Sequence, residues 1–512
     1  MARTRLFARV EQAMRLARRT QGILVPRALT RRQALVLGAA SLAAACASTG
    51  SKKDDNGPIA IIGGGAAGLT VAYRLAKAGR RVTVYESSAR FGGRMFTRRN
   101  FTAEGQFCEL GGELVDSNHE NLIALASELG VGIQRLVAED DPGGDLYDIG
   151  GKLRSPRDML DPATGTGAFL PLAAKIAEDQ AALLDADENW TRRARELDAM
   201  TLKAYLDALR PLTQGWAVDL VDLAYLGEYG QPTERQSALN LVDFIGVDPT
   251  RPFEVFGESD EAHRIAGGSS SLIEALIAAL EGKATLKARH ALYNIVRDGA
   301  RLRMTFEAPS GLLDEVYDEV VLALPFTRLR KVEGLAELGL TPEKLSAIND
   351  LGYGNNAKLM VATTSRPWTS GKASFGAALY SDRGFQCVWE TSRGQEGTGG
   401  ILTNFMAGAR ADGDEKGTLA SLAAGLAAIS PAFGSSLDPE TRASFFWERY
   451  PHMLGSYASP RTGQYSTMLE AAPMAELNGR LHFAGEHTSA DFLGYMNGAV
   501  ESGERVAREI LA

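Results

Sequence analysis

Hydrophobic and polar positions follow two different periods along the first part of the chain, and this predicts strands and helices. Residues 58–62 form a short apolar run that ends at a glycine, and residues 81–85 alternate, so both segments predict strands. Between them, residues 66–78 have apolar side chains at helical spacing and are followed by Gly79. The pattern therefore predicts a strand–helix–strand unit.

Helical and strand-like stretches further along indicate two interleaved domains. Residues 170–184 and 202–209 have helical spacing, residues 291–296 and 320–324 are strand-like, and residues 481–486 form a strand followed by a turn. We therefore expect an α/β fold with two domains. The first is a discontinuous Rossmann-type domain made of residues 57–120, 256–335 and 471–512, and the second is a mixed α+β domain made of residues 121–255 and 336–470.

Residues 1–50 have the pattern of a targeting segment. Arg31 and Arg32 precede an apolar run over residues 34–45, which is too short to span a bilayer and ends in small residues before Cys46. This resembles a bacterial twin-arginine export signal, and residues 42–46 resemble a lipoprotein box with its aliphatic residue one place further from the cysteine than usual. We expect an exported protein, periplasmic or anchored to the membrane through an acylated Cys46. An organellar transit peptide and a disordered tail are the alternatives.

Charge and cysteine content narrow the classes of partner. The formal net charge is −8 and the only strongly basic stretch is the first 32 residues, which argues against a nucleic-acid partner and favours small neutral or cationic substrates. The cysteines Cys46, Cys108 and Cys387 are too few for a disulfide framework, and neither they nor the six histidines have metal-ligand spacing. We expect no metal. Pairing of two cysteines and the oligomeric state stay open.

A glycine-rich turn after the first strand carries the first sign of chemistry. Gly63, Gly65 and Gly68 fit the pattern G-x-G-x-x-G directly after a strand and at the start of a helix, where the backbone can approach a pyrophosphate. Glu86 ends the next strand, where its carboxylate can accept hydrogen bonds from an adenosine ribose. This arrangement predicts a dinucleotide site; an ordinary tight turn is the alternative.

The segment that follows distinguishes between cofactors. Residues 86–94, Glu-Ser-Ser-Ala-Arg-Phe-Gly-Gly-Arg, resemble the E-x-x-x-R-x-G-G-R stretch of the FAD-dependent amine oxidase family. The resemblance implies FAD, with thin glycine backbone beside the cofactor and with Arg94 supplying positive charge near its phosphates or ribityl chain. A surface loop with two structural arginines is the alternative.

The resemblance extends over most of the chain from residue 58 onward. Residues 110–115 look like the glycine pair on the flavin face, Leu292 is placed like a residue whose backbone meets adenine, and residues 483–488 and 494–503 resemble the C-terminal signature, in which Glu486 would bond the ribityl chain. The cofactor contacts implied are Gly63, Gly65, Ala66, Ala67, Gly68, Glu86, Arg90, Gly93, Arg94, Gly111, Gly112, Glu113, Leu292, Gly485, Glu486, Gly494, Tyr495 and Met496.

The same resemblance implies the catalytic groups. Lys358, ten residues before Trp368, resembles the flavin-facing lysine, and a solvent-facing lysine is the alternative. Lys331 is a less favoured candidate for the same role. Tyr457 and Tyr495 match the positions of an aromatic pair that would hold an amine in front of the flavin. Ser456 stands where some family members carry a flavin-bonding cysteine, so we expect non-covalent FAD.

The function expected from these residues is oxidative deamination of an amine, with hydride transfer to flavin N5 and reduction of dioxygen to hydrogen peroxide. Residues 113–116 offer no arginine for a substrate carboxylate, and Glu113, if it faced the pocket, would favour an amine or a second ammonium group; a buried structural hydrogen bond is its alternative. An L-amino-acid oxidase, a carotenoid-type desaturase and a non-catalytic flavin-binding surface lipoprotein are the competing functions.

Overall fold

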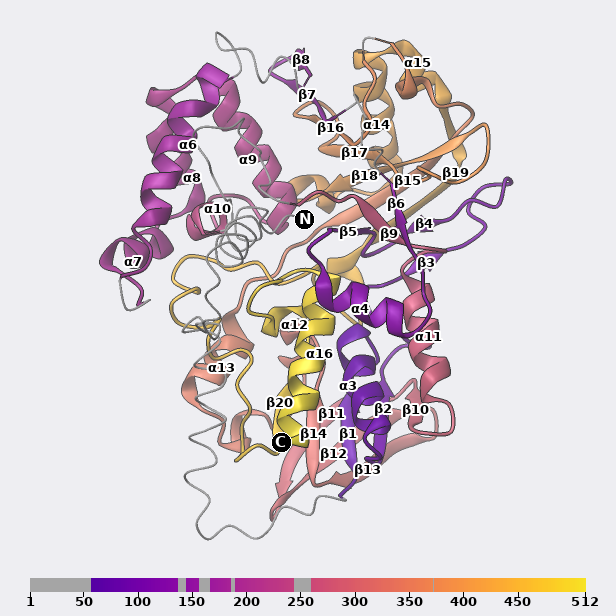
Figure 1. Ribbon diagram of the computed structural model, residues 1–512, viewed down its shortest axis with the longest axis vertical. Coiled ribbons are helices and arrows are strands. Elements are labelled where there is room, and N and C mark those ends of the chain that lie inside the picture. Colours follow the sequence, from indigo (N-terminus) through magenta and orange to yellow (C-terminus); the bar gives the residue numbers. More distant parts are fainter. Residues whose placement is uncertain (1–56, 137–143, 156–165, 186–188, 244–258, 372) are drawn as a thin grey trace, which may run out of the picture.

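The computed structural model describes residues 57–136, 144–155, 166–185, 189–243, 259–371 and 373–512. The predicted export signal and Cys46 lie outside these residues. Figure 1 shows two layered regions: one is built on a parallel sheet with α3, α11 and α16, and the other on a larger sheet with α6, α8 and α9 at one side and α14 and α15 at the other.

A five-stranded parallel sheet forms the first region, and its strands come from distant parts of the sequence. In spatial order they are β10 (Thr285–Ala288), β2 (Val82–Glu86), β1 (Ile59–Ile62), β14 (Glu319–Leu322) and β20 (Leu481–Phe483). Ile59 pairs with Val82 on one side and with Glu319 on the other. The sheet therefore joins the beginning, middle and end of the chain.

The two faces of this sheet pack against different layers. Because side chains alternate along a strand, Ile59 and Ile61 of β1 face a cluster that includes the helices, whereas Ala60 and Ile62 face a second cluster. The helices are α3 (Ala66–Lys77), α4 (Glu120–Glu128), α11 (Ser270–Leu280) and α16 (Met496–Leu511). The second cluster includes a three-stranded antiparallel sheet of β11 (Ala291–Asp298), β12 (Arg301–Ala308) and β13 (Gly311–Tyr317), with α12 (Phe326–Leu329) and α13 (Pro342–Asp350) beside it.

A seven-stranded mixed sheet forms the second region. Its order is β19 (Leu437–Phe446), β15 (Ala357–Thr363), β18 (Gly400–Met406), β17 (Cys387–Glu390), β16 (Ala378–Ser381), β7 (Leu146–Ile149) and β8 (Lys152–Arg154). All residues of β15, β16, β17 and β18 are buried, so these strands carry no alternation of polarity. On this sheet lie α14 (Glu415–Ile429) and α15 (Pro431–Ser436).

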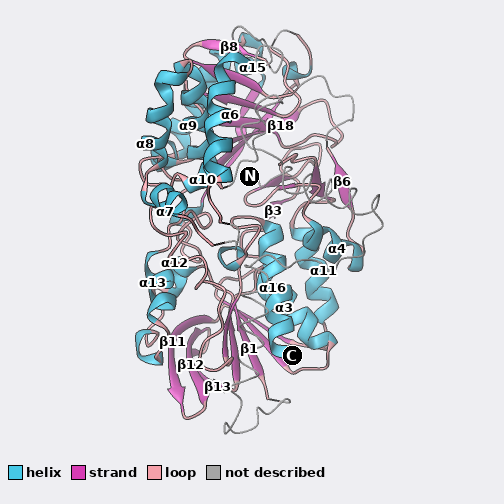
Figure 2. Ribbon diagram, turned by 60° about the vertical axis from the view of Figure 1, so that its left-hand side comes forward, coloured by secondary structure: helices cyan, strands magenta, loops and turns pink. Residues whose placement is uncertain are grey.

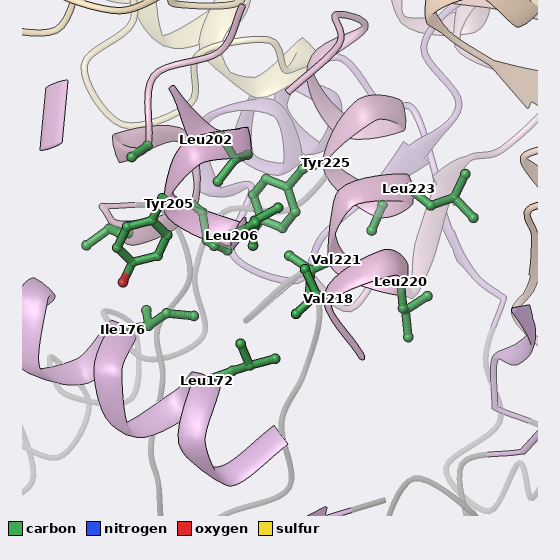
Figure 3. Close-up of a cluster of buried hydrophobic side chains, with 14 of the residues drawn as sticks. Leu172, Ile176, Leu202, Tyr205, Leu206, Val218, Leu220, Val221, Leu223 and Tyr225 are labelled. Atoms are coloured by element: carbon green, nitrogen blue, oxygen red, sulfur yellow. The ribbon is translucent and has the colours of Figure 1, made fainter. Parts of the chain in front are cut away.

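A helical layer covers the other side of the second region, as Figure 2 shows. It comprises α6 (Thr166–Ala181), α7 (Arg192–Ala199), α8 (Leu202–Leu209), α9 (Gly215–Tyr229) and α10 (Leu239–Val242). Leu172 and Ile176 of α6 meet Leu206 of α8 and Val221 of α9 in one hydrophobic cluster (Figure 3). This cluster also contains Tyr457, so the helical layer is packed directly against a predicted site residue.

The remaining strands are short and connect the two regions. They form a pair, β3 (Thr97–Arg98) with β4 (Cys108–Glu109), and a three-stranded sheet of β5 (Leu114–Val115), β9 (His263–Ile265) and β6 (Ile133–Arg135). Cys108 and Cys387 are both free thiols and buried. None of the helices in the described parts of the chain has the length and apolar character needed to cross a membrane.

Candidate active site

A cavity of about 1030 Å³, partly open to solvent, lies at the carboxyl ends of the parallel strands. Gly63 follows β1, Glu86 ends β2, Ala323 follows β14 and Gly485 lies beyond β20, and all four line the cavity. Ligands of open parallel sheets bind at this edge. Sixteen of the predicted residues line the cavity: Gly63, Gly65, Ala66, Ala67, Glu86, Gly93, Arg94, Gly111, Gly112, Lys358, Tyr457, Gly485, Glu486, Gly494, Tyr495 and Met496.

The first glycine turn leaves open space at the start of α3. A Cβ atom on Gly63 would lie 2.4 Å from the carbonyl oxygen of Ala323, so close packing requires this glycine. A Cβ atom on Gly65 would meet nothing closer than 3.9 Å, the Cα atom of Gly93. Gly65 caps α3 without a side-chain hydrogen bond, and the first turn of α3 carries no acidic residue. The helix N-terminus therefore presents backbone N–H groups to an anionic ligand.

Glu86 is oriented by backbone amides at the end of β2. Its Oε2 accepts a hydrogen bond from the Gly64 N–H at 2.9 Å, and its Oε1 accepts one from the Ser88 N–H at 2.7 Å. Since each carboxylate oxygen has two acceptor sites, the buried carboxylate can still accept further hydrogen bonds from a ligand hydroxyl.

Arg94 and Glu486 form an ion pair in the cavity wall. Arg94 Nη1 lies 2.7 Å from Glu486 Oε1 and also donates to the carbonyl oxygen of Ser456 at 2.8 Å. The other oxygen of Glu486 accepts from the Gly494 N–H at 2.7 Å, and Oε1 accepts from the Ala458 N–H at 3.2 Å. One carboxylate thus fixes the segments that carry Tyr457 and Tyr495.

The glycine pair at 111–112 and the last helix form another wall. A Cβ atom on Gly111 would lie 1.9 Å from the carbonyl oxygen of Arg94, and one on Gly112 would lie 2.7 Å from Met496 Sδ, so neither position has room for a side chain. Helix α16 begins after Tyr495 with no side-chain cap and no acidic residue in its first turn. Its first N–H groups are therefore available to an electron-rich ligand edge.

Lys358 lies on the buried strand β15 and is held by acceptors of the 109–113 segment. Its Nζ lies 2.8 Å from Glu113 Oε2 and 2.9 and 3.3 Å from the carbonyl oxygens of Gly111 and Glu109. Glu113 Oε1 accepts from Trp389 Nε1 at 3.0 Å and from the Thr391 hydroxyl. Burial acts to raise the pKa of Glu113, but Lys358 and these hydrogen bonds hold it below its usual value.

Two tyrosines close the cavity on the side of the helical layer. Tyr457 is 8% exposed, and its hydroxyl donates to the carbonyl oxygens of Glu228 at 2.8 Å and of Gly227 at 3.2 Å. Tyr495 is 7% exposed, and its ring meets His119 edge-on at 5.1 Å between centroids. Within the described residues, the Tyr495 hydroxyl is buried without a hydrogen-bond partner. A polar group of this kind is costly unless a ligand or water satisfies it.

A family model described as flavin containing amine oxidoreductase matches residues 66–511. The chain belongs to this family of flavin-containing amine oxidoreductases. It is therefore an FAD-dependent oxidoreductase, as the motifs predicted.

Relatives and solved structures agree with this assignment. The probable flavin-containing monoamine oxidase A of Dictyostelium discoideum is 26% identical over 466 residues, which are 88% of this chain and 97% of that protein. An L-amino-acid oxidase of Demansia vestigiata is 25% identical over 487 residues, 91% of this chain and 89% of that protein. Putrescine oxidase bound to putrescine gives a TM-score of 0.75 at 21% identity and covers 89% of this chain and 99% of its own. Cyclohexylamine oxidase from Brevibacterium oxydans gives a TM-score of 0.74 at 20% identity and covers 89% of this chain and 98% of its own.

These structures confirm the expected fold class, and the cavity of this family member fits FAD. Two helix N-termini without side-chain caps lie at it, a Cβ atom on Gly65 would meet nothing closer than 3.9 Å, and Glu86 offers acceptors at the end of β2. The start of α3 would hold the pyrophosphate, Glu86 the ribose, and the start of α16 with Gly112 the flavin ring.

Four predicted cofactor residues lie outside the residues that line the cavity. Gly68 allows α3 to pack on β1, since a Cβ atom there would lie 2.0 Å from the carbonyl oxygen of Gly63. Arg90 binds the carbonyl oxygens of Phe91, Gly93 and Met95, and so stiffens the loop below the cavity.

The other two predicted residues are buried in protein contacts. Leu292 packs in the hydrophobic cluster of β11 and β12, and Glu113 is bound by Lys358, Trp389 and Thr391. These buried hydrogen bonds of Glu113 are of the kind that its structural alternative predicts. Lys331, the less favoured alternative to Lys358, is exposed.

Sequence reasoning missed part of the lining. The additional lining residues are Ser87, Gly92, Met95, Ala323, Leu324, Pro325, Asn356, Phe405, Trp447, His452, Met453, Ser456 and Ala499. Several of these residues lie in segments that carried a signal: Ser87 and Gly92 fall in the 86–94 motif, Ser456 precedes Tyr457, and Ala499 falls in the 494–503 signature. Leu324 and Pro325 follow a predicted strand, and a turn after a parallel strand lies at the ligand-binding edge. Phe405 lies in a fully buried strand, where one apolar residue looks like any other.

Proposed function

We propose that this family member oxidises an amine to an imine, which hydrolyses to an aldehyde or ketone and ammonia, with FAD bound non-covalently. The chemistry that bound FAD would supply is acceptance of a hydride from the α-carbon of the neutral amine and transfer of two electrons to dioxygen, with hydrogen peroxide as the product. The chain supplies orientation and a site from which water is excluded. Neither free thiol of the described residues, Cys108 or Cys387, lines the cavity, which supports non-covalent binding.

The two cationic side chains that line the cavity are both paired with carboxylates, and this favours an amine over an amino acid as the substrate. Among the described lining residues, the one arginine is Arg94, which is bound by Glu486 at 2.7 Å, and the one lysine is Lys358, which is bound by Glu113 at 2.8 Å. A substrate carboxylate would have to compete with these buried carboxylates for their cations. An amine brings no such group.

Tyr457 and Tyr495 form the substrate-facing wall in this proposal. Their π-faces attract a cationic amine as it enters, and the bonds of the Tyr457 hydroxyl to the end of α9 fix the position of its ring. Lys358 holds the 109–113 segment, and thereby the glycine pair, against the sheet of the second region.

The test uses residues 51–512 purified with bound FAD. Amines should bleach the flavin anaerobically, and readmitted air should yield peroxide and ammonia in equal amounts. Lys358→Met should retain FAD and slow flavin reduction or reoxidation. A flavin that no amine reduces would reject the proposal, and wild-type kinetics in Lys358→Met would remove Lys358 from the reaction.

An L-amino-acid oxidase is the second candidate, and the 25% identity to such an enzyme over 91% of this chain favours it. Reduction of the flavin by L-amino acids alone would establish it. Residues 1–50 support export by the twin-arginine route, with a periplasmic or lipid-anchored product. Replacement of Arg31 and Arg32 by lysine should retain the precursor in the cytoplasm of a bacterial host; unchanged export would contradict this.

A further inference from the structure

A histidine lies at the end of the flavin cavity that is formed by the start of α3 and the end of β2, here called the diphosphate end. His452 lines the cavity together with Glu86 and Ser87. Its Nδ1 lies 2.9 Å from the Ser87 hydroxyl, and that hydroxyl donates to Glu86 Oε1 at 3.4 Å. The imidazole is therefore connected through Ser87 to the carboxylate that would hold the ribose.

The other ring nitrogen of His452 is available to a ligand. Among the described residues, Nε2 has no hydrogen-bond partner, and the side chain is only partly buried. The ring is held by the Ser87 bond and by an edge-on contact with Tyr450, 5.1 Å between centroids. A neutral imidazole has one N–H donor, whereas a protonated imidazole has two. Protonated His452 can therefore donate to Ser87 and to an anionic ligand at the same time.

The charged groups around His452 come from three elements, and cations outnumber anions among them. Glu86 of β2 favours the protonated imidazole, whereas Arg328 of α12 and Arg90 of the loop after β2 disfavour it. Burial is the largest effect and also disfavours it, so the pKa of His452 lies below its usual value.

Arg328 adds to this excess of positive charge. In the part of the chain that the structure describes, its guanidinium has neither an ion-pair partner nor a hydrogen bond. Burial lowers its pKa, and the charge of Glu307 only partly offsets this. An anion at the diphosphate end would compensate the two arginines and favour the protonated form of His452.

We propose that His452 is a proton-linked contact for the diphosphate of FAD, so that the protein binds its cofactor more tightly as the pH falls. This concerns cofactor affinity whatever the substrate, and it rests on the proposed non-covalent binding of FAD. Neither phosphate of FAD is a terminal monoester with a second pKa of about 6, so the proton taken up on binding resides on the imidazole. Because His452 is neutral near pH 7 in the free protein and charged beside the diphosphate, a rise in pH weakens binding.

The test measures release of FAD from the diluted holoenzyme at about pH 5.5 and about pH 8, on either side of the usual histidine pKa, with free FAD separated by ultrafiltration. Competition with ADP-ribose, which carries the same diphosphate without a flavin, places any effect at the diphosphate end. The variants are His452→Gln, which is neutral, and His452→Lys, which stays charged. His290→Gln is the matched control, because His290 is a partly buried histidine whose Nδ1 contacts the carbonyl oxygen of Ala288 and which does not line the cavity.

We expect wild type and the control to bind FAD and ADP-ribose at least about tenfold more tightly at the lower pH, the effect of one pKa unit. His452→Gln should match wild type at the higher pH and change its affinity less than about threefold across the range, and His452→Lys should bind tightly at both pH values.

The outcomes separate this proposal from the proposed binding mode. A wild-type affinity that does not change with pH overturns the proton link, and so does a full pH dependence that persists in either His452 variant. Since the two variants make opposite demands on the site, one of them decides the question if the other does not fold. Flavin that stays with the protein after denaturation would overturn non-covalent binding and this proposal with it, whereas dissociable FAD without pH dependence would overturn this proposal alone.

Discussion

The buried ion pair of Lys358 and Glu113 provides a quantitative test of how the two regions are joined. The side chains are 4% and 6% exposed, and the pair links strand β15 of the mixed sheet to the segment beside the glycine pair. Replacing one member, as in Glu113→Gln, leaves the other charge buried without its partner. Breaking such a pair costs about 3–5 kcal/mol, whereas an exposed pair contributes about 0–1 kcal/mol.

A double-mutant cycle separates this interaction from loss of packing. We expect Glu113→Gln and Lys358→Met each to lower the free energy of unfolding by about 3–5 kcal/mol. The double variant should lose about 1–3 kcal/mol less than the sum of the two, since no uncompensated charge remains. Chemical denaturation of the apoprotein supplies the three values without reference to catalysis.

Glu390 gives a matched control for the burial of a carboxylate near the same strand. It is 7% exposed, accepts hydrogen bonds from Trp368 and Ser392, and pairs with Arg366 at 3.1 Å, but it does not contact Lys358. Glu390→Gln should therefore show no coupling to Lys358→Met. Additive losses for Glu113 and Lys358, or single losses below about 1 kcal/mol, would refute the argument.

Three further predictions concern pH dependence and the cofactor cradle. Burial raises the pKa of Glu109 to about 7, so wild type should lose about 3 kcal/mol of stability relative to Glu109→Gln between about pH 4.5 and 7, and parallel pH curves would contradict this. Burial holds the pKa of His487 well below its usual value, so the contribution of His487 to stability is complete above about pH 6.5 and is lost as the pH drops below it. In a plot of the free energy of unfolding against pH, His487→Phe should therefore flatten the decline on the acid side. An unchanged decline would contradict the assignment. Gly65→Ala should leave the melting temperature of the apoprotein within a few degrees of the wild-type value, because its Cβ meets no close neighbour. It should weaken FAD binding by at least about tenfold in a titration followed by flavin fluorescence, because the Cβ enters space left for the pyrophosphate. A wild-type affinity would show that the cofactor does not approach this turn.

The sequence was informative where local geometry demands a particular residue. The glycines at 63, 65, 111 and 112 and the carboxylate of Glu86 line the cavity because turns after strands and close backbone approach restrict which residues fit. Four strands of the parallel sheet, β1, β2, β14 and β20, could be anticipated from short apolar or alternating runs, whereas β10 is a partly exposed segment, Thr285–Ala288, without such a run.

Pairings made across the fold had no such signal. Glu113 meets Trp389 and Thr391, 276 and 278 residues further along, and the register of a fully buried sheet decides that contact. Because Glu113 directly follows the glycine pair in the sequence, it was a candidate for contact with the substrate. In the folded chain, strand β15 places Lys358 next to its carboxylate. Arg90 similarly matches a cofactor motif, and yet its guanidinium donates to carbonyl oxygens of its own loop.

The most direct test of the central claim compares 2-phenylethylamine with L-phenylalanine, which differ by one carboxylate, as anaerobic reductants of the bound flavin. The paired state of Arg94 and Lys358 predicts rapid bleaching by the amine and bleaching by the amino acid that is slower by at least about 100-fold, as expected when a buried anion lacks a free partner. Faster bleaching by the amino acid would contradict the assignment and make the enzyme an L-amino-acid oxidase.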